Sequence, residues 1–382
     1  MIRFDVVMAG GGMIVRDQIL PSLYQLRRLG LIGEITVCAR HEETLRALSG
    51  DEQIREAFPA QTFRQYVGAY DSMIAHLPKR NLVVVALPDH LHFDAVMTAL
   101  KADQHVLAVK PLVLYTAEAA EIEKEASRRA LLVAVEYHKR FDDRSLMARR
   151  KYRAGDFGEF KLGAAVLMEK WNYRHSNFQN WFTTDNSDAF TYIGCHYIDL
   201  VHFITGLLPR SVSVYGIEDA LPNGNTGYLW TDARVIWNNG ACLNVQNSLS
   251  FPDEAPGTNT QGLTMYFSKG ERGGYLRHDD QYRGVQYVTS TYSEPSPDYF
   301  QYVPAESGGL VPVGYGYRSI EAIVRACARV EQARDRAAAL REIDAEGILA
   351  TPANSRYNEQ VIEAGRRSIL SGGAIVRIES AT

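Results

Sequence analysis

Residues 2–12 read IRFDVVMAGGG, and this stretch decides the fold of the first part of the chain. An apolar, β-branched run ends at three consecutive glycines, and apolar residues then recur at helical spacing over residues 19–26. A strand, a glycine turn and a helix in this order are the start of a βαβ unit. The stretch therefore predicts a parallel sheet that begins with a phosphate-binding type of loop.

Further apolar runs follow at regular intervals. They read EITVCA (residues 34–39), LVVVAL (82–87), HVLAV (105–109) and LLVAV (131–135), with a helical pattern over residues 93–100. The run at 82–87 is apolar at every position, which is typical of a central parallel strand covered on both faces. We expect an α/β Rossmann domain with a doubly wound parallel sheet over residues 1–130.

The pattern changes in the second part of the chain. From residue 159 to 267 polar and apolar residues alternate, as in RVIW (234–237), and turn clusters such as PNGN (222–225) separate the runs. A helix is expected near residues 193–205, a long surface excursion over 270–315, and helices over 320–334 and 355–370. Residues 131–382 are therefore predicted to form an α+β domain with a large, mostly antiparallel open sheet.

Composition narrows the class of protein. The 382 residues allow two domains, and 41 Lys and Arg against 45 Asp and Glu give a net charge of −4. This balance argues against nucleic-acid and membrane partners. No segment has the roughly 18 uninterrupted apolar residues of a membrane span, and the first residues are typical of a strand and not of a signal peptide. Four scattered cysteines favour reduced thiols in a cytoplasmic enzyme.

The glycine loop and the following strand end predict a dinucleotide site. Gly10 permits the turn, Gly12 lets the backbone approach a pyrophosphate, and Met13 and Ile14 begin the helix, although Val15 replaces the third glycine of the motif. A plain βα turn is the alternative. Arg40 follows the second strand where NAD-binding units carry a carboxylate, which favours NADP over NAD. An exposed arginine without a role is the alternative.

Two other strand ends carry chemically active side chains. Leu87 ends the 82–87 strand, and Pro88 and His92 follow it, where a loop packs against a cofactor. A metal site is disfavoured because no third ligand has a suitable spacing. Lys110 follows the 105–109 strand, where its ammonium group can orient a substrate hydroxyl. A solvated surface lysine is the alternative.

The expected helix near residue 195 carries a possible proton relay. Tyr192, His196 and Asp199 are spaced i, i+4 and i+7, which places them on one helical face. A histidine flanked by Tyr and Ile on a helix is otherwise packed in a core. His196 and His202 are six residues apart and do not share a face, so no metal ion is expected here either.

Several segments in order resemble the Gfo/Idh/MocA family, named for glucose–fructose oxidoreductase and inositol dehydrogenase. The segments are VMAGGG (7–12), VVALPDHLH (84–92), HVLAVKPL (105–112), EYHKRFD (136–142), GDFGE (155–159) and IGCHYIDL (193–200). The resemblance implies NAD(P)-dependent oxidation of a secondary hydroxyl of a sugar, sugar derivative or cyclic polyol. It also implies a homodimer or homotetramer formed through the sheet of the second domain.

The resemblance assigns roles to individual positions. The family's catalytic lysine falls on Lys110, with Val109 in place of the preceding glutamate, and its catalytic histidine falls on His196. The aspartate four residues earlier is Tyr192, and the asparagine common near the nicotinamide is His138. These departures place the chain in a divergent branch. The departures at Val109 and Tyr192 leave open a non-catalytic NADP(H)-binding sensor or regulator. A reductase of a conjugated or imine substrate is a third hypothesis.

An aromatic segment precedes the proposed catalytic helix and is the candidate sugar-binding surface. Aromatic faces suit sugar rings, but the same side chains could fill an interface. The candidate substrate residues are Trp171, Tyr173, Arg174, Trp181 and, on the helix itself, Asp199.

Overall fold

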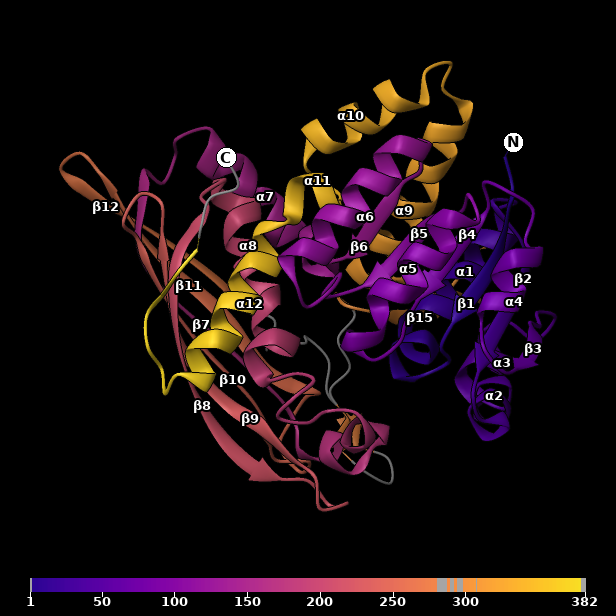
Figure 1. Cartoon of the computed structure of the whole chain (residues 1–382), viewed down its shortest axis with the longest axis horizontal. Helices are drawn as coiled ribbons and strands as arrows, with labels where there is room; N and C mark the ends of the chain where they lie inside the picture. Colours follow the sequence, from indigo (N-terminus) through magenta and orange to yellow (C-terminus); the bar gives the residue numbers. More distant parts are fainter. Residues whose placement is uncertain (1, 280–286, 289–291, 294–297, 307, 379–382) are drawn as a thin grey trace. The chain divides into compact units, whose positions relative to one another are not determined.

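The computed structural model describes residues 2–279, 287–288, 292–293, 298–306 and 308–378. The chain folds into two compact units, coloured by sequence in Figure 1. The first unit comprises Met1–Val113, Ala117–Phe141 and Pro297–Arg356, and the second comprises Leu114–Thr116, Asp142–Ser296 and Tyr357–Thr382. The division therefore differs from the predicted single boundary at residue 130, because a late segment returns to the first unit.

The first unit is built on a six-stranded parallel sheet, as predicted. The strand order is β3-β2-β1-β4-β5-β6. The strands are β1 (Phe4–Ala9), β2 (Ile32–Ala39), β3 (Arg64–Val67), β4 (Leu82–Val85), β5 (His105–Val109) and β6 (Val133–Glu136). The order reverses between β1 and β4, so the crevice at their carboxyl ends is where ligands bind in such sheets.

Helices of this unit cover the sheet, and the first of them follows the glycine loop directly. They are the π-helical turn η1 (Val15–Ile19), α1 (Leu20–Arg28), α2 (Glu42–Ser49), α3 (Glu52–Ala57), α4 (Asp71–His76), α5 (His92–Lys101) and α6 (Thr116–Arg129), with short 3-10 turns η2 (Asp89–Leu91) and η3 (His138–Phe141). Asp51 caps α3 by accepting a hydrogen bond from the Ile54 N–H at 2.9 Å.

The returning segment belongs to the first unit because of its apolar face. It contains the hairpin β15 (Gln301–Pro304) and β16 (Leu310–Val313), then α9 (Tyr315–Gln332), α10 (Arg336–Glu346) and α11 (Pro352–Ser355). Ile320, Ile323, Val324 and Cys327 of α9 are fully buried in the same core as β1 and α1. Burial of this stripe holds α9 on the Rossmann sheet.

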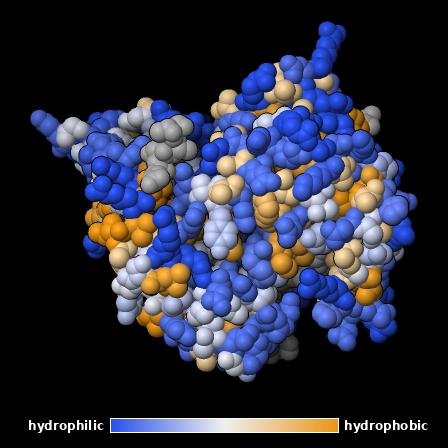
Figure 2. Space-filling model, in the orientation of Figure 1, coloured by the Kyte–Doolittle hydropathy of each residue, from blue (hydrophilic) through white to orange (hydrophobic). Residues whose placement is uncertain are grey.

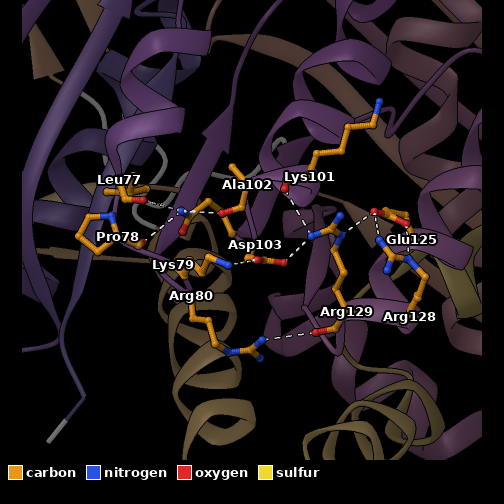
Figure 3. Close-up of polar contacts among 11 residues, drawn as sticks. Leu77, Pro78, Lys79, Arg80, Lys101, Ala102, Asp103, Glu125, Arg128 and Arg129 are labelled. Atoms are coloured by element: carbon orange, nitrogen blue, oxygen red, sulfur yellow. Dashed lines mark hydrogen bonds and ion pairs between the residues drawn. The ribbon is translucent and has the colours of Figure 1, made fainter.

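Figure 3 shows polar contacts between the segments that precede β4 and β5 and helix α6. These segments lie at the amino-terminal ends of the strands, and the glycine loop follows the carboxyl end of β1. Asp103 lies 2.9 Å from Lys79 Nζ and 2.5 Å from Arg129 Nη1. Arg80, just before β4, lies 2.6 Å from Glu331 of α9. These contacts hold loops and helices together at the amino-terminal ends of the strands. They do not involve the side chains at the carboxyl edge of the sheet.

The second unit is built on a seven-stranded sheet that is mostly antiparallel, as predicted. Its order is β12-β11-β7-β10-β9-β8-β17, and only the β10–β7 pair is parallel among the described residues. The strands are β7 (Glu159–Lys170), β8 (Pro209–Ala220), β9 (Thr226–Trp237), β10 (Cys242–Phe251), β11 (Asn259–Lys269), β12 (Arg272–Asp279) and β17 (Val376–Arg377).

One face of this sheet is covered by helices of the same unit. They are α7 (Asp143–Arg153), α8 (Cys195–Thr205) and α12 (Tyr357–Leu370), with short turns η4 (Trp171–His175), η5 (Asn177–Asn180) and the π-helical η6 (Phe190–Gly194). A short pair, β13 (Tyr287–Val288) and β14 (Tyr292–Ser293), follows β12. Across the two units, no helix among the described residues has the length and apolar character needed to cross a bilayer.

The predicted excursion over residues 270–315 is wrong at both of its ends. Residues 272–279 form β12, the edge strand paired with β11, and residues 301–313 form the β15–β16 hairpin of the first unit. Two consecutive glycines, Gly273 and Gly274, obscured in the sequence pattern a strand that pairs with the neighbouring strand β11. Residues 280–286, 289–291, 294–297 and 307, which carry the rest of this prediction, lie outside the described residues.

The face of the molecule in Figure 2 is mostly hydrophilic, with apolar residues in separate patches.

Candidate active site

The glycine loop after β1 has one tightly packed glycine and one open glycine. Gly10 has φ of +103°, and a Cβ there would lie 2.1 Å from the carbonyl oxygen of Ala86. A Cβ at Gly12 would meet nothing within 4 Å. The N–H groups of Val15 and Arg16 both donate to the Gly12 carbonyl at 3.1 Å, which starts the helix directly behind the loop.

This geometry fits a dinucleotide pyrophosphate. Open space at Gly12 is what a close backbone approach to phosphate requires, and Met13 and Ile14 begin the helix, whose first N–H groups have no partner within the helix. Val15, which replaces the third glycine of the motif, is fully buried and so fills space between helix and sheet. Gly10, by contrast, is needed by the protein's own packing.

The end of β2 carries a basic side chain and no carboxylate. Arg40 directly follows the strand and is exposed, and α2 begins two residues later at Glu42. Burial raises the pKa of Tyr70, the charges of Asp71 and Asp94 add to this shift, and the charge of Arg40 opposes it. A cation at this place suits the 2′-phosphate of NADP.

His92 joins the loop after β4 to the loop after β5. Its Nε2 lies 2.8 Å from the Leu87 carbonyl oxygen, and its Nδ1 lies 2.8 Å from that of Pro111. The imidazole is fully buried. Both ring nitrogens are thus engaged by the backbone, so His92 positions Leu87, Pro88 and the Lys110-Pro111 segment; this differs from the direct cofactor contact that the sequence predicts for His92.

Lys110 and His138 follow adjacent strands. Lys110 comes directly after β5, and Val109 is paired with Glu136, the last residue of β6. The carboxyl ends of parallel strands share one edge of a sheet, so Lys110, His138 and the glycine loop after β1 are brought to one edge of the first unit. The Lys110-Pro111 peptide bond is cis.

His138 belongs to a buried polar network that the sequence pattern does not reveal. Its Nδ1 lies 3.0 Å from Oε2 of Glu136, whose side chain is 2% exposed. The other carboxylate oxygen accepts hydrogen bonds from Gln18 and Ser319. The one sequence signal is a glutamate ending an otherwise apolar strand; its other two partners, Gln18 and Ser319, are more than 100 positions away along the chain.

In the second unit, Tyr192 and His196 lie at the junction of two helical segments. Tyr192 is part of η6, where its N–H donates to the Asp188 carbonyl at 2.9 Å, and His196 is the second residue of α8. The two residues therefore do not belong to one regular α-helix, as predicted from their i, i+4 spacing, because Tyr192 lies in a π-helical turn. His196 is 8% exposed.

Tyr192 and Trp181, two of the residues predicted to form the site, come together in an aromatic cluster. The ring centroids of Tyr192 lie 5.0 Å from Phe178, 5.8 Å from Trp181 and 6.4 Å from Phe182. Phe178 and Phe182 are buried, whereas Trp181 and Tyr192 are partly exposed. Two partly exposed aromatic rings beside a helix that carries a histidine suit a sugar ring.

Two other predicted substrate residues are engaged inside the second unit. Asp199 is 1% exposed and accepts hydrogen bonds from the Tyr357 hydroxyl at 2.8 Å and the Asn358 amide at 2.9 Å. It thereby anchors α8 to α12. This placement differs from the predicted substrate contact, because a carboxylate between two helices is most easily stabilised by their own donors.

Arg174 is likewise held by the protein. Its guanidinium donates to the Leu249 carbonyl and to Asp219, each at 2.7 Å, and lies 3.8 Å from the Trp171 ring centroid. The Arg174 side chain is 3% exposed and Trp171 40% exposed. Trp171, Tyr173 and Arg174 all lie in η4.

Metal ligands are not grouped in the described part of the chain. No set of three or more His, Cys, Asp or Glu side chains there could hold a metal ion.

Family models match both units. Residues 4–137 match the "Oxidoreductase family, NAD-binding Rossmann fold" and residues 145–271 match the "GFO/IDH/MocA C-terminal domain". An "uncharacterized oxidoreductase" of Schizosaccharomyces pombe is 32% identical over 174 residues, 44% of each chain. A scyllo-inositol 2-dehydrogenase (NADP(+)) of Bacillus subtilis is 24% identical over 143 residues, 37% of this chain and 38% of that protein. The matches thus span less than half the length of these curated relatives.

Solved structures share the whole architecture. GenD2 from gentamicin A biosynthesis, in complex with NAD, has a TM-score of 0.70 at 18% identity and covers 100% of this chain and 97% of its own. The scyllo-inositol dehydrogenase of Lactobacillus casei with NAD(H) and scyllo-inositol has a TM-score of 0.62 at 16% identity, covering 98% and 99%. At these identities the likeness establishes the fold.

Proposed function

We propose that this chain, a member of the Gfo/Idh/MocA family of oxidoreductases, oxidises a secondary hydroxyl of a sugar, sugar derivative or cyclic polyol. The observation that carries the proposal is the edge of the first unit's sheet: a glycine loop open at Gly12 and a lysine, Lys110, at the end of β5. The open loop suits the pyrophosphate of a dinucleotide, and the lysine suits a substrate hydroxyl beside the cofactor. Relatives named as inositol and sugar dehydrogenases support the substrate class.

Each side chain has a defined task in this reaction. A bound nicotinamide supplies the acceptor for the hydride that leaves the carbinol carbon. Lys110 donates a hydrogen bond to the reacting hydroxyl oxygen and stabilises the negative charge that develops there. His196 accepts the hydroxyl proton, and Tyr192 donates a hydrogen bond or passes the proton on. The partly exposed ring of Trp181 offers a stacking face for the sugar.

The cofactor preference is proposed to be NADP. Arg40 is exposed at the end of β2, and residues 39–41 include no carboxylate that would bond a ribose 2′-hydroxyl. Two relatives, the D-xylose 1-dehydrogenase of Hypocrea jecorina and the inositol dehydrogenase of Bacillus subtilis, carry NADP(+) in their names. NAD is the alternative, and the direct test compares both cofactors.

We further propose a cytoplasmic homodimer or homotetramer that forms through the sheet of the second unit. Several large apolar or aromatic residues on its strands are at least 48% exposed. They are Leu162, Tyr215, Ile217, Tyr266 and Tyr275. Exposed apolar and aromatic side chains on a mostly antiparallel sheet favour an interface with a second copy of the chain.

A substrate panel tests the activity. The protein is incubated with sugars, sugar acids and cyclic polyols and with NADP or NAD, and the absorbance of the reduced nicotinamide is followed. We expect turnover with at least one polyhydroxylated substrate, and we expect Lys110→Met to abolish it while NADPH still binds. Near-normal turnover by Lys110→Met would refute the role of this lysine, and binding without turnover on any substrate would favour a regulator.

A further inference from the structure

An exposed tryptophan of the second unit lies against a buried arginine. Trp171 is 40% exposed, and its ring centroid lies 3.8 Å from the guanidinium carbon of Arg174. The same carbon lies 5.5 Å from the ring centroid of Trp230, in β9. The Arg174 side chain is only 3% exposed. It therefore covers one face of the Trp171 indole, and the exposed area of Trp171 belongs to the rest of the ring.

Arg174 also holds a carboxylate beside this indole. Its Nη1 donates to Oδ2 of Asp219, near the end of β8, at 2.7 Å, and Nε1 of Trp230 donates to the same oxygen at 3.3 Å. Oδ1 of Asp219 accepts from the Ala220 N–H at 2.8 Å. The hydrogen bond from Arg174 lowers the pKa of Asp219, whose side chain is 40% exposed. A carboxylate has about four acceptor positions, so Asp219 can accept a further hydrogen bond from outside the chain.

The short turn η4, which carries Trp171, is fixed along its length. Just before it, Lys170 donates to three backbone carbonyl oxygens of residues 252–255 at 2.6–3.2 Å. The Asn172 N–H donates to a side chain of the same segment at 2.9 Å, and Nε of Arg174 donates to a backbone carbonyl of β10 at 2.7 Å. The exposed indole is therefore held in one orientation before any ligand binds, which lowers the entropy cost of binding.

One nitrogen of the buried guanidinium lacks a partner. Nη2 of Arg174 is buried and has no hydrogen-bond partner among the residues that the structure describes, whereas Nε and Nη1 are both engaged. Buried polar groups are nearly always hydrogen-bonded. An acceptor from outside the chain, at the edge of the Trp171 indole, would complete the set of partners.

The charges near the indole determine which ligand fits. Asp253 and Glu254 are exposed, and Asp219 is partly exposed. The positive charges of Lys170 and Arg174 are engaged by the protein itself. The surrounding carboxylates disfavour phosphates and sugar acids, because like charges repel. They also disfavour a dry protein interface, whose centre is depleted of charged residues. An aromatic face next to hydrogen-bond acceptors suits the C–H face and the hydroxyl groups of an uncharged sugar ring.

We propose that Trp171 and Asp219 form a saccharide subsite for a sugar ring other than the one that reacts, so that the substrate is a glycoside of at least two rings. The subsite stands on the contacts above, and the two-ring substrate rests on the proposed function. Trp171 stacks on the second ring, Asp219 accepts a hydrogen bond from one of its hydroxyls, and Arg174 is the positioning residue for both. Trp181, the proposed stacking face for the reacting ring, follows η5, which packs against η4.

The tryptophans of the chain allow each subsite to be observed separately. The four of them, at positions 171, 181, 230 and 237, each give one indole N–H signal in a ¹H–¹⁵N spectrum of the full chain. Single Trp→Phe variants assign the signals, and the probes are maltose and cellobiose. We expect at least one of these disaccharides to shift the signals of Trp171 and Trp230 and to leave that of the fully buried Trp237 unchanged. The signals of Trp171 and Trp181 should give one common Kd, because one molecule contacts both rings.

Variants at the exposed indole test its contribution to affinity. Trp171→Ala removes the stacking face, and we expect the Kd of the disaccharide to rise roughly three- to tenfold. Trp171→Phe keeps an aromatic ring and should restore most of the affinity. Tyr275→Ala removes a 55% exposed ring from β12 and is the matched control, with a Kd within about twofold of the wild type. Sedimentation should show the oligomeric state of the wild type for Trp171→Ala. The spectra of the wild type remain decisive if a variant fails to fold.

Different results overturn different statements. A Trp171 signal that neither disaccharide shifts, or disaccharide binding by Trp171→Ala that equals that of the wild type, overturns the subsite; turnover of a single-ring sugar then leaves the proposed function intact. A changed oligomeric state of Trp171→Ala makes Trp171 an interface residue and overturns the inference as well. Separate Kd values for the Trp171 and Trp181 signals overturn the two-ring substrate. Absence of turnover on every polyhydroxylated substrate refutes the proposed function, and with it the two-ring substrate.

Discussion

The open glycine of the phosphate loop offers a test in which stability and binding change in opposite directions. A Cβ added at Gly12 meets nothing within 4 Å, and this residue does not have a positive φ. Gly12→Ala therefore creates no clash in the protein alone. Because alanine reduces the freedom of the unfolded chain, the free energy of unfolding should stay the same or rise by about 0.4–1 kcal/mol.

Binding should suffer instead. The methyl group would occupy the space through which a pyrophosphate approaches the loop, and it would separate the phosphate from the N–H groups at the start of the helix. Loss of one hydrogen bond to a charged group costs about 1.5–3 kcal/mol. That corresponds to a Kd for NADPH that is higher by roughly 10- to 100-fold.

The assay pairs thermal unfolding with a titration of NADPH fluorescence, and Gly10→Ala is the matched comparison. A Cβ at Gly10 would lie 2.1 Å from a backbone oxygen, and its φ is +103°, so this variant should lose stability before any ligand is added. If Gly12→Ala binds NADPH as tightly as the wild type, the loop does not hold the pyrophosphate and the assignment of the site is refuted.

Two further predictions concern charge. Arg40→Asp should shift the preference from NADP toward NAD, measured as the ratio of kcat/KM for the two cofactors, and an unchanged ratio would remove the argument for NADP. At the opposite edge of the sheet, burial raises the pKa of Glu331, but hydrogen bonds from His105 and Arg80 outweigh it and lower the pKa to about 2. Because the pKa of Glu331 is lower in the folded state than in the unfolded state, the ionised carboxylate stabilises the folded protein at pH values above the unfolded-state pKa. This contribution to the free energy of unfolding, about 1–3 kcal/mol, should disappear as the pH falls from about 4.5 toward 2. Denaturant unfolding of the wild type and Glu331→Gln should show a difference at neutral pH that vanishes in acid; a constant difference would contradict this reasoning.

The parts of the fold that the sequence predicts correctly are those set by local pattern. Continuous apolar runs identify β1, β4 and β5, and alternation identifies β9 and β10, because each pattern reflects how many faces of the strand are buried. Parallel strands end at a common edge, so Lys110 and the glycine loop could be placed on one edge without any structure.

What the sequence could not predict depends on contacts between distant segments. Residues 297–356 return to the first unit because α9 buries its apolar stripe there, and an amphipathic helix does not indicate which sheet it covers. Two of the partners of Glu136, Gln18 and Ser319, are 118 and 183 positions away along the chain. His92 and Asp199 have side-chain types suited to a site, and only their hydrogen bonds show that the backbone or a neighbouring helix engages them.

The resemblance to the family places an aspartate at the position of Tyr192, and the surroundings of Tyr192 suit a phenol better than a carboxylate. The side chain at this position lies within 5.0–6.4 Å, between ring centroids, of Phe178, Trp181 and Phe182. A carboxylate among three aromatic rings would lose hydration without gaining an opposite charge from them, whereas a phenol packs its ring there and keeps a hydroxyl for hydrogen bonding. In the proposed reaction the phenol leaves His196 as the proton acceptor and gives the second unit a neutral aromatic face, which suits an uncharged polyhydroxylated ring better than an acidic one.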